Sequence, residues 1–212
     1  MSRPSEIGTK NGKRVFSDPV QQRNGRGDLA DHLASDVQNL IRTFEAIRGD
    51  DFTSAALSLV RAEQLWGIGF GDNYPLAHFA RAQLIKIKPD IRMIPIGGFS
   101  VPEEFASITS MDSVLALSFG RSSSTLRSIL QSARLAGADT VSLTDQVSSG
   151  FPNLAKVTLR CRTQGLSYFD SVAAPVSVIT HLCATVAKQI GQNAVERLRY
   201  IESIHSDWGG AN

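Results

Sequence analysis

The chain has 212 residues, of which 42% are apolar and 20% charged, and its formal net charge is +2. This length suits one α/β domain with a few extra elements and is too short for two full domains. No apolar run approaches the roughly 18 to 20 residues of a membrane span, and the polar, basic start has no signal-peptide core, so we expect a cytoplasmic protein. So small a net charge does not by itself indicate nucleic-acid binding.

Residues 1–28 contain six Lys or Arg, three Asp or Glu and few large apolar side chains. This composition is typical of a flexible basic arm or a linker remnant, and less so of an arm that contacts DNA. We expect the folded domain to cover residues 29–206, with a short tail over residues 207–212.

Apolar side chains at spacings of three and four then predict an amphipathic helix that ends near Gly49. They are Leu29, Leu33, Val37, Leu40, Ile41 and Phe44. A second helix is predicted over "DDFTSAALSLVRAE", and beyond it short apolar segments alternate with helical patterns. The predicted strands are residues 64–68, 91–95, 113–117, 140–143 and 156–159. The predicted later helices are residues 75–87, 103–108, 123–135, 172–190 and 193–205.

Strands that alternate with helices predict an α/β fold, a three-layer α-β-α sandwich with a five-stranded parallel sheet, here preceded by an N-terminal helix. Right-handed crossovers place every strand-to-helix loop at one edge of the sheet, where ligands bind in open α/β folds. Two loops therefore matter most for function: "GFGDNYP" after the first strand and "SFGRSSST" after the third.

The first loop has glycines at Gly69 and Gly71, which permit a tight turn and a close approach of the backbone. A dinucleotide-binding fingerprint would have a third glycine near position 74, where this chain has Tyr74, so that class of site is not expected. A helix start capped by Asp72 or Asn73, with Pro75 in the first turn, explains the same residues structurally.

The second loop is rich in hydroxyl groups at the predicted start of a helix. They belong to Ser118, Ser122, Ser123, Ser124 and Thr125. A single serine there would be a helix cap, whereas several hydroxyls, a helix N-terminus and Arg121 together form a possible phosphate or carboxylate cradle. The residues alone leave both interpretations open. No GK[ST] follows, so a Walker loop is excluded.

The order of these parts resembles the sugar isomerase (SIS) domain family, particularly the effector domain of RpiR-type transcriptional regulators, over residues 29–205. In the first loop the matching positions are Gly69, Gly71, Asn73 and Ala77. In the second loop and its helix they are Ser118, Gly120, Arg121, Ser123, Gly137 and Ala138. An apolar strand ending in Thr144 and Asp145 completes the likeness, together with the long helix from Val172.

The resemblance implies a flavodoxin-like sheet, a homodimer or tetramer formed through helices, and a sugar phosphate or related anionic sugar derivative held by the two loops. In RpiR-type regulators such a domain senses its ligand and controls an N-terminal helix-turn-helix. Residues 1–28 show no pair of amphipathic helices, so DNA binding is expected only through a domain absent from this chain. No cofactor or metal is expected.

The chain departs from the family pattern at Asn73 and Gly120, where serines are usual, and at Arg121, where glycine is usual. Each lost hydroxyl removes a hydrogen bond of about 1.5–3 kcal/mol to an anion, and an inward guanidinium could replace them. The predicted ligand-binding residues are Gly71, Asn73, Ser118, Gly120, Arg121, Ser122, Ser123 and Thr125.

We predict no catalytic residue. An aldose-ketose isomerase needs a base, usually Glu or His, yet no Glu lies between Glu104 and Glu196. His78 and His181 fit structural positions better, although His181 stays a remote catalytic candidate. A non-catalytic sensor is therefore favoured over a sugar phosphate isomerase and over an oligomerising SIS scaffold with a degenerate site.

Two further features bear on the assembly and chemistry of the chain. Cys161 and Cys183 have no CxxC spacing, so a disulfide or metal role is not expected, and Cys183 fits a buried thiol. The apolar stripe of the first helix, and the nearly all-round apolar segment 172–190, both favour a homodimer or larger assembly.

Overall fold

The computed structural model describes residues 9–10, 13–14, 25–97, 100–120, 123–145, 154–166 and 168–209. Its main sheet has five parallel strands in the order β4-β3-β5-β6-β7. The strands are β3 (Leu65–Gly69), β4 (Ile91–Ile94), β5 (Ser113–Ser118), β6 (Asp139–Thr144) and β7 (Val157–Arg160). This is the flavodoxin-like order. The predicted five-stranded parallel sheet is confirmed, and each strand boundary lies within one residue of its predicted place.

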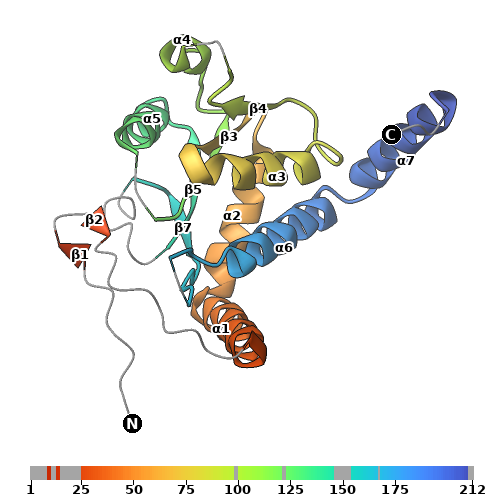
Figure 1. Ribbon diagram of the computed structural model, residues 1–212. Helices are drawn as coiled ribbons and strands as arrows, with labels where there is room; N and C mark the ends of the chain where they lie inside the picture. The colour runs from red at the N-terminus through yellow and green to blue at the C-terminus, as the bar shows by residue number, and fades with distance from the viewer. Residues whose placement is uncertain are drawn as a thin grey trace.

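Helices cover both faces of the sheet, so the predicted three-layer sandwich is confirmed (Figure 1). One face carries α2 (Gly49–Arg61), α3 (Tyr74–Leu84) and α6 (Ala173–Ile190), and the other carries α4 (Val101–Phe105) and α5 (Ser124–Leu135). Neighbouring residues of a strand point to opposite faces. In β5, Leu115 and Leu117 therefore join the first core and Val114 and Ala116 the second.

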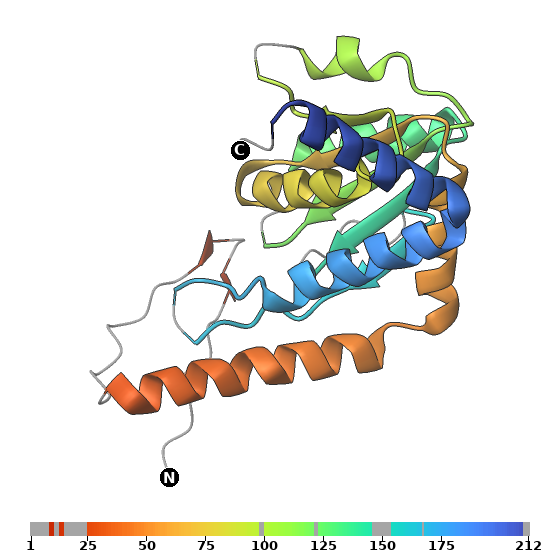
Figure 2. The same cartoon turned by 90° about the vertical axis from the view of Figure 1, so that its right-hand side faces the viewer.

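Helix α1 (Gly25–Ala46) begins one turn before its apolar stripe and runs along the side of the domain before the chain turns into α2 (Figure 2). It docks on the segment after β7 through polar groups. Asn39 Nδ2 donates to the backbone oxygen of Gln164 at 2.8 Å, and Arg162 N–H donates to Thr43 Oγ1 at 2.8 Å. The buried side chains on the described part of α1 are Asn39 and Thr43, both polar.

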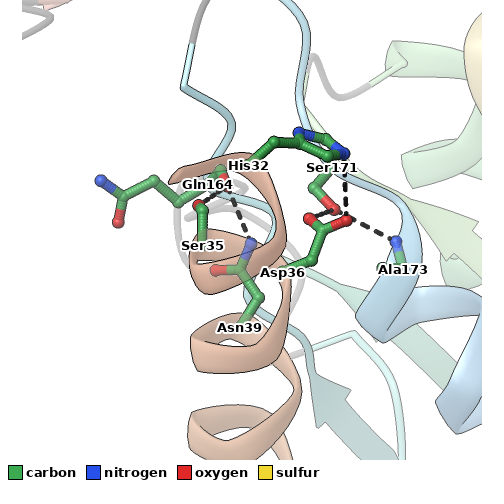
Figure 3. Close-up of polar contacts among 7 residues, drawn as sticks. All are labelled: His32, Ser35, Asp36, Asn39, Gln164, Ser171 and Ala173. Atoms are coloured by element: carbon green, nitrogen blue, oxygen red, sulfur yellow. Dashed lines mark hydrogen bonds and ion pairs between the residues drawn. The ribbon is translucent and has the colours of Figure 1, made fainter. Parts of the chain in front are cut away.

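The N-terminal half of α1 is held in the same way (Figure 3). Ser35 Oγ donates to the backbone oxygen of Gln164 at 3.3 Å, and Ser171 Oγ donates to Asp36 Oδ1 at 2.6 Å. His32 lies one turn before Asp36, with 3.4 Å between Nε2 and Oδ2. The polar side of α1 therefore faces its own domain.

The apolar stripe of α1 is consequently exposed for the most part, although Phe44 at its C-terminal end meets His181 of α6. Its exposed members are Leu29 (72%), Leu33 (64%), Val37 (44%), Ile41 (48%) and Phe44 (42%). Exposed apolar residues scattered singly are ordinary, whereas a continuous row along one helix is not.

Helix α6 buries most of its apolar side chains against other helices of the same chain. It packs against α1, α2, α3 and α7 (Gln192–Asp207). The apolar content of segment 172–190 therefore needs no second chain, which removes one of the two sequence arguments for an oligomer. Helix α7 extends away from the body (Figure 1), and its buried residue is Ala194.

Part of the predicted N-terminal arm has regular structure: Thr9–Lys10 (β1) pairs antiparallel with Lys13–Arg14 (β2). Helix α1 starts at Gly25, four residues before the predicted start, since helical hydrogen bonding continues beyond the apolar pattern. None of the helices in the described ranges has the length and apolar character that crossing a membrane requires.

Two single substitutions, one at Gly69 and a control at Gly49, test the close packing at the end of β3. A Cβ atom at Gly69 would lie 2.8 Å from the Asn73 carbonyl carbon and 2.9 Å from Ala77 Cβ. Gly69→Ala should therefore lower the free energy of unfolding by about 1–3 kcal/mol. Gly49→Ala is the control: nothing lies within 4 Å of its added Cβ, and stability should rise by up to about 1 kcal/mol. Urea denaturation measures both, and equal stabilities would contradict the packing argument.

Candidate functional site

The two loops singled out by the sequence lie together at the carboxyl edge of the sheet, because β3 and β5 are neighbouring strands. The first loop contains the short helix η1 (Gly71–Asn73), and the second leads from Ser118 to the start of α5. Gly71 has φ +57° and Gly120 has φ +75°, in the left-handed region that favours glycine. Both glycines are thus needed for the turns of their loops.

The side chain of Asn73 ties the two loops together. Its Oδ1 accepts the Phe119 N–H at 2.8 Å, and its Nδ2 donates to the Phe119 carbonyl at 3.2 Å. Asn73 is 6% exposed, so these bonds are shielded from water. Asn73 occupies the N-cap position of α3 and was one of the two caps that the sequence left open, but its side chain makes no capping bond there. The amide shapes the site, and a ligand contact from Asn73 stays a prediction.

Two residues at the end of β6 hold the backbone of the second loop. Thr144 Oγ1 donates to the Ser118 carbonyl at 2.8 Å, and Asp145 Oδ2 accepts the Gly120 N–H at 2.6 Å. Ser118 is 1% exposed and Asp145 is 3% exposed. The sequence analysis used Asp145 only as the end of the apolar strand in the SIS-like pattern, and the available signal for its contact with this loop was its place directly after a buried strand.

The N-terminus of α5 presents donors to the same edge. Ser123 is its N-cap residue, with extended backbone (φ −85°, ψ 133°), and its hydroxyl makes no capping bond. Ser124 and Thr125 are exposed, and the first turn contains no acidic residue. The first-turn N–H groups and the positive end of the helix dipole attract anions. The predicted site residues Arg121 and Ser122 lie outside the described residues.

Arg160 is a charged residue that sequence reasoning missed. It is the last residue of β7 and makes a long contact of 3.5 Å from one guanidinium nitrogen to the Asp145 carbonyl oxygen. Asp145 in turn accepts from the second loop, so Arg160 brings a positive charge close to this edge. Its position at the end of a strand was the signal that could have identified it.

The histidines and cysteines lie in other surroundings. His181 stacks on Phe52 with 4.8 Å between ring centroids, and His78 meets Tyr74 edge to face at 5.5 Å. The predicted burial of Cys183 is confirmed, and Cys161 is buried too.

Burial raises the pKa of both thiols to about 12, and the Asp145 charge adds to this at Cys161. Protonated thiols are poor nucleophiles and poor metal ligands. Within the described ranges, no three His, Cys, Asp or Glu side chains gather as metal ligands would.

Residues 58–187 match the SIS domain family, which is more than half of the chain, and the chain belongs to this family. The fold is similar to the sugar isomerase domain of an RpiR transcription factor from Sphaerobacter thermophilus (22% identity, TM-score 0.77), over 82% of this chain and 98% of that one. It is also similar to the Vibrio vulnificus NanR protein complexed with ManNAc-6P (18% identity, TM-score 0.71), over 88% of this chain and 72% of that one.

Isomerases share this fold as well. A phosphoheptose isomerase from Francisella tularensis has 15% identity and a TM-score of 0.63, over 78% of this chain and 100% of that one. No curated protein sequence matches the chain. The SIS resemblance is thus confirmed, and since regulators and isomerases have the same architecture, the fold alone does not separate the two functions.

Removing the Asn73 side chain tests whether its hydrogen bonds hold the two loops together. Asn73→Ala leaves the Phe119 N–H and carbonyl without their partner in a buried place, so the free energy of unfolding should fall by about 1–3 kcal/mol. Hydrogen exchange at the Phe119 amide should accelerate as well. Asn193→Ala, at an exposed position on α7, is the matched control and should change neither quantity. Unaltered exchange at Phe119 in Asn73→Ala would contradict the assignment.

Proposed function

We propose that this chain is a non-catalytic phosphosugar-binding domain that senses a sugar phosphate or a related anionic sugar derivative, as the effector domain of an RpiR-type transcriptional regulator. The observation that carries the proposal is the start of α5. There a 12-residue helix without acidic residues in its first turn meets a Ser123 hydroxyl that makes no capping bond. Free donors at the positive end of a helix suit a phosphate group.

The proposed binding site combines backbone and hydroxyl groups of both loops. The backbone of Gly71 and Gly120 allows a close approach, and the hydroxyls of Ser118, Ser123 and Thr125 supply donors. Arg121 and Ser122 are proposed to complete the site. Asn73 contributes indirectly: its side chain bonds the backbone of Phe119, and these bonds hold the second loop beside the first.

The groups next to the loops support binding more than catalysis. Moving a proton between neighbouring carbons requires a base within hydrogen-bond reach of the substrate. Of the described carboxylates at this edge, Asp145 is buried and already accepts a bond from Gly120 N–H, whereas Asp72 is exposed in η1 of the first loop. His181 contacts Phe52 and Phe44, on α2 and α1, rather than the loops.

Ser123→Asp separates ligand binding from stability. Aspartate is a good N-cap and favours the helix dipole, so the free energy of unfolding should stay equal or rise by about 0.3–1 kcal/mol. The new negative charge should nevertheless repel a phosphate and abolish the thermal stabilisation by sugar phosphates. The measurement is differential scanning fluorimetry with a panel of hexose, pentose and amino-sugar phosphates that includes ManNAc-6P.

Ser203→Asp, an exposed change on α7, is the control and should keep the ligand response. Nuclear magnetic resonance of the same mixtures should show no conversion of the sugar. Turnover would favour the isomerase, and the absence of any thermal shift in the wild-type chain would favour a scaffold with a degenerate site.

We also propose that the chain forms a homodimer or tetramer in which a second copy covers the apolar stripe of α1. The support is the orientation of this helix, whose polar side faces its own domain while Leu29, Leu33 and Ile41 are exposed. Burial of such side chains stabilises an interface by roughly 25 cal/mol per Å² of apolar surface.

Light scattering coupled to size-exclusion chromatography tests this assembly. The double variant Leu33→Glu/Ile41→Glu should be monomeric and keep its fold, because neither side chain is buried in its own domain. Gln38→Glu, an exposed polar change on the same helix, should leave the oligomer intact. A wild-type chain that is monomeric at every concentration tested would rule out the assembly.

A further inference from the structure

A cavity of about 230 Å³ lies beside β7, the edge strand of the sheet. Its walls are the C-terminal end of α1, the start of α2 and β7 with the residues that follow it. None of the residues predicted to bind a sugar phosphate lines this cavity. The cavity is therefore a different place from the two loops.

Arginine dominates the charge of this cavity. Arg42, Arg48, Arg160 and Arg162 line it, against Asp51 as the acidic lining residue. The Nε atom of Arg48 lies 4.0 Å from Asp51 Oδ2, and the two side chains are 77% and 51% exposed, so this ion pair contributes little. Arginines gathered around one hollow repel each other, and a bound anion would offset that repulsion.

Backbone donors at the edge of β7 add to the charge. The Cys161 N–H donates to Thr144 in β6, whereas the Arg162 N–H donates outward to Thr43 Oγ1 on α1. N–H groups alternate in direction along a strand, so those of Thr158 and Arg160 point to the open edge, like that of Arg162.

The α2 N-terminus contributes less to an anion site. This helix has 13 residues and no side-chain cap, and its first turn lies at the cavity. However, Asp50 and Asp51 stand in that first turn and already offset the helix dipole. The arginines and the edge of β7 therefore carry the inference.

We propose that this cavity is a second anion site that binds a small anion with a phosphate group, such as inorganic phosphate, pyrophosphate or a short phosphorylated compound. Guanidinium groups recognise phosphate oxygens through paired N–H donors. The volume is below the roughly 300–1,000 Å³ of pockets for larger organic ligands, which fits a small anion.

The bound anion would join two parts of the chain. Arg42 belongs to α1 and Arg48 to the α1–α2 connection, whereas Arg160 is the last residue of β7 and Arg162 follows it. An anion between them would therefore attach the end of α1 to the edge of the sheet. Binding should reduce hydrogen exchange at residues 42–51 and 158–162.

Isothermal titration of pyrophosphate into the full chain at low salt tests the site. The wild-type chain should bind, and Arg42→Gln/Arg162→Gln should bind at least about tenfold more weakly, since each arginine makes charge-assisted bonds to the anion. Arg162 keeps its backbone bond to Thr43 in this variant. The matched control, Arg199→Gln, removes an exposed arginine of α7 and should bind like the wild type.

Ser123→Asp distinguishes this site from the loops, because it should lose the sugar phosphate response and keep pyrophosphate binding. The proposal is overturned if the wild type does not bind pyrophosphate, if the double arginine variant binds as well as the wild type, or if Ser123→Asp abolishes binding. Hydrogen exchange of the wild-type chain is a further test of the proposal that requires no substitution. Pyrophosphate should protect residues 42–51 and 158–162, and unchanged exchange there also overturns the proposal.

Discussion

Two hydrogen bonds between the Asn73 side chain and the backbone of Phe119 hold the first and second loops together, and the candidate site depends on them. The parallel sheet brings the ends of β3 and β5 to the same edge, but it does not determine how the loops beyond them are placed. The bonds are buried, so water does not compete for them. Asp145 holds Gly120 from the other side, and together the two contacts position the start of α5.

Helix α1 is attached to the domain by polar contacts, unlike the helices that pack on the sheet. Helices α2 to α6 bury apolar side chains in the two cores, whereas α1 is attached by the side chains of Ser35, Asp36, Asn39 and Thr43. Each such bond contributes only about 0.5–1.5 kcal/mol net. The attachment of α1 is therefore weaker than that of a helix in the core, and a partner on its apolar side or an anion at its end would strengthen it.

Positive charge is concentrated around the end of β7, with Arg160 as the connection between the two proposed sites. Its guanidinium group contacts the Asp145 carbonyl next to the second loop, and the same residue lines the arginine cavity. The two sites differ in what supplies the donors. The loops offer hydroxyls and a helix start, while the cavity offers guanidinium groups and a strand edge. A sugar phosphate matches the first set, and a compact, highly charged anion matches the second.

The sequence by itself determined the strands, the helices, the edge that carries the loops and the start of α5 near Ser123, because each depends on local periodicity and turn chemistry. It also identified the SIS family through the order of its motifs. Only the tertiary structure decided which way the α1 stripe faces, that Asn73 bonds Phe119, and that Arg42 and Arg162 share a cavity. These features depend on contacts between segments far apart in the chain, which no local pattern of residues records.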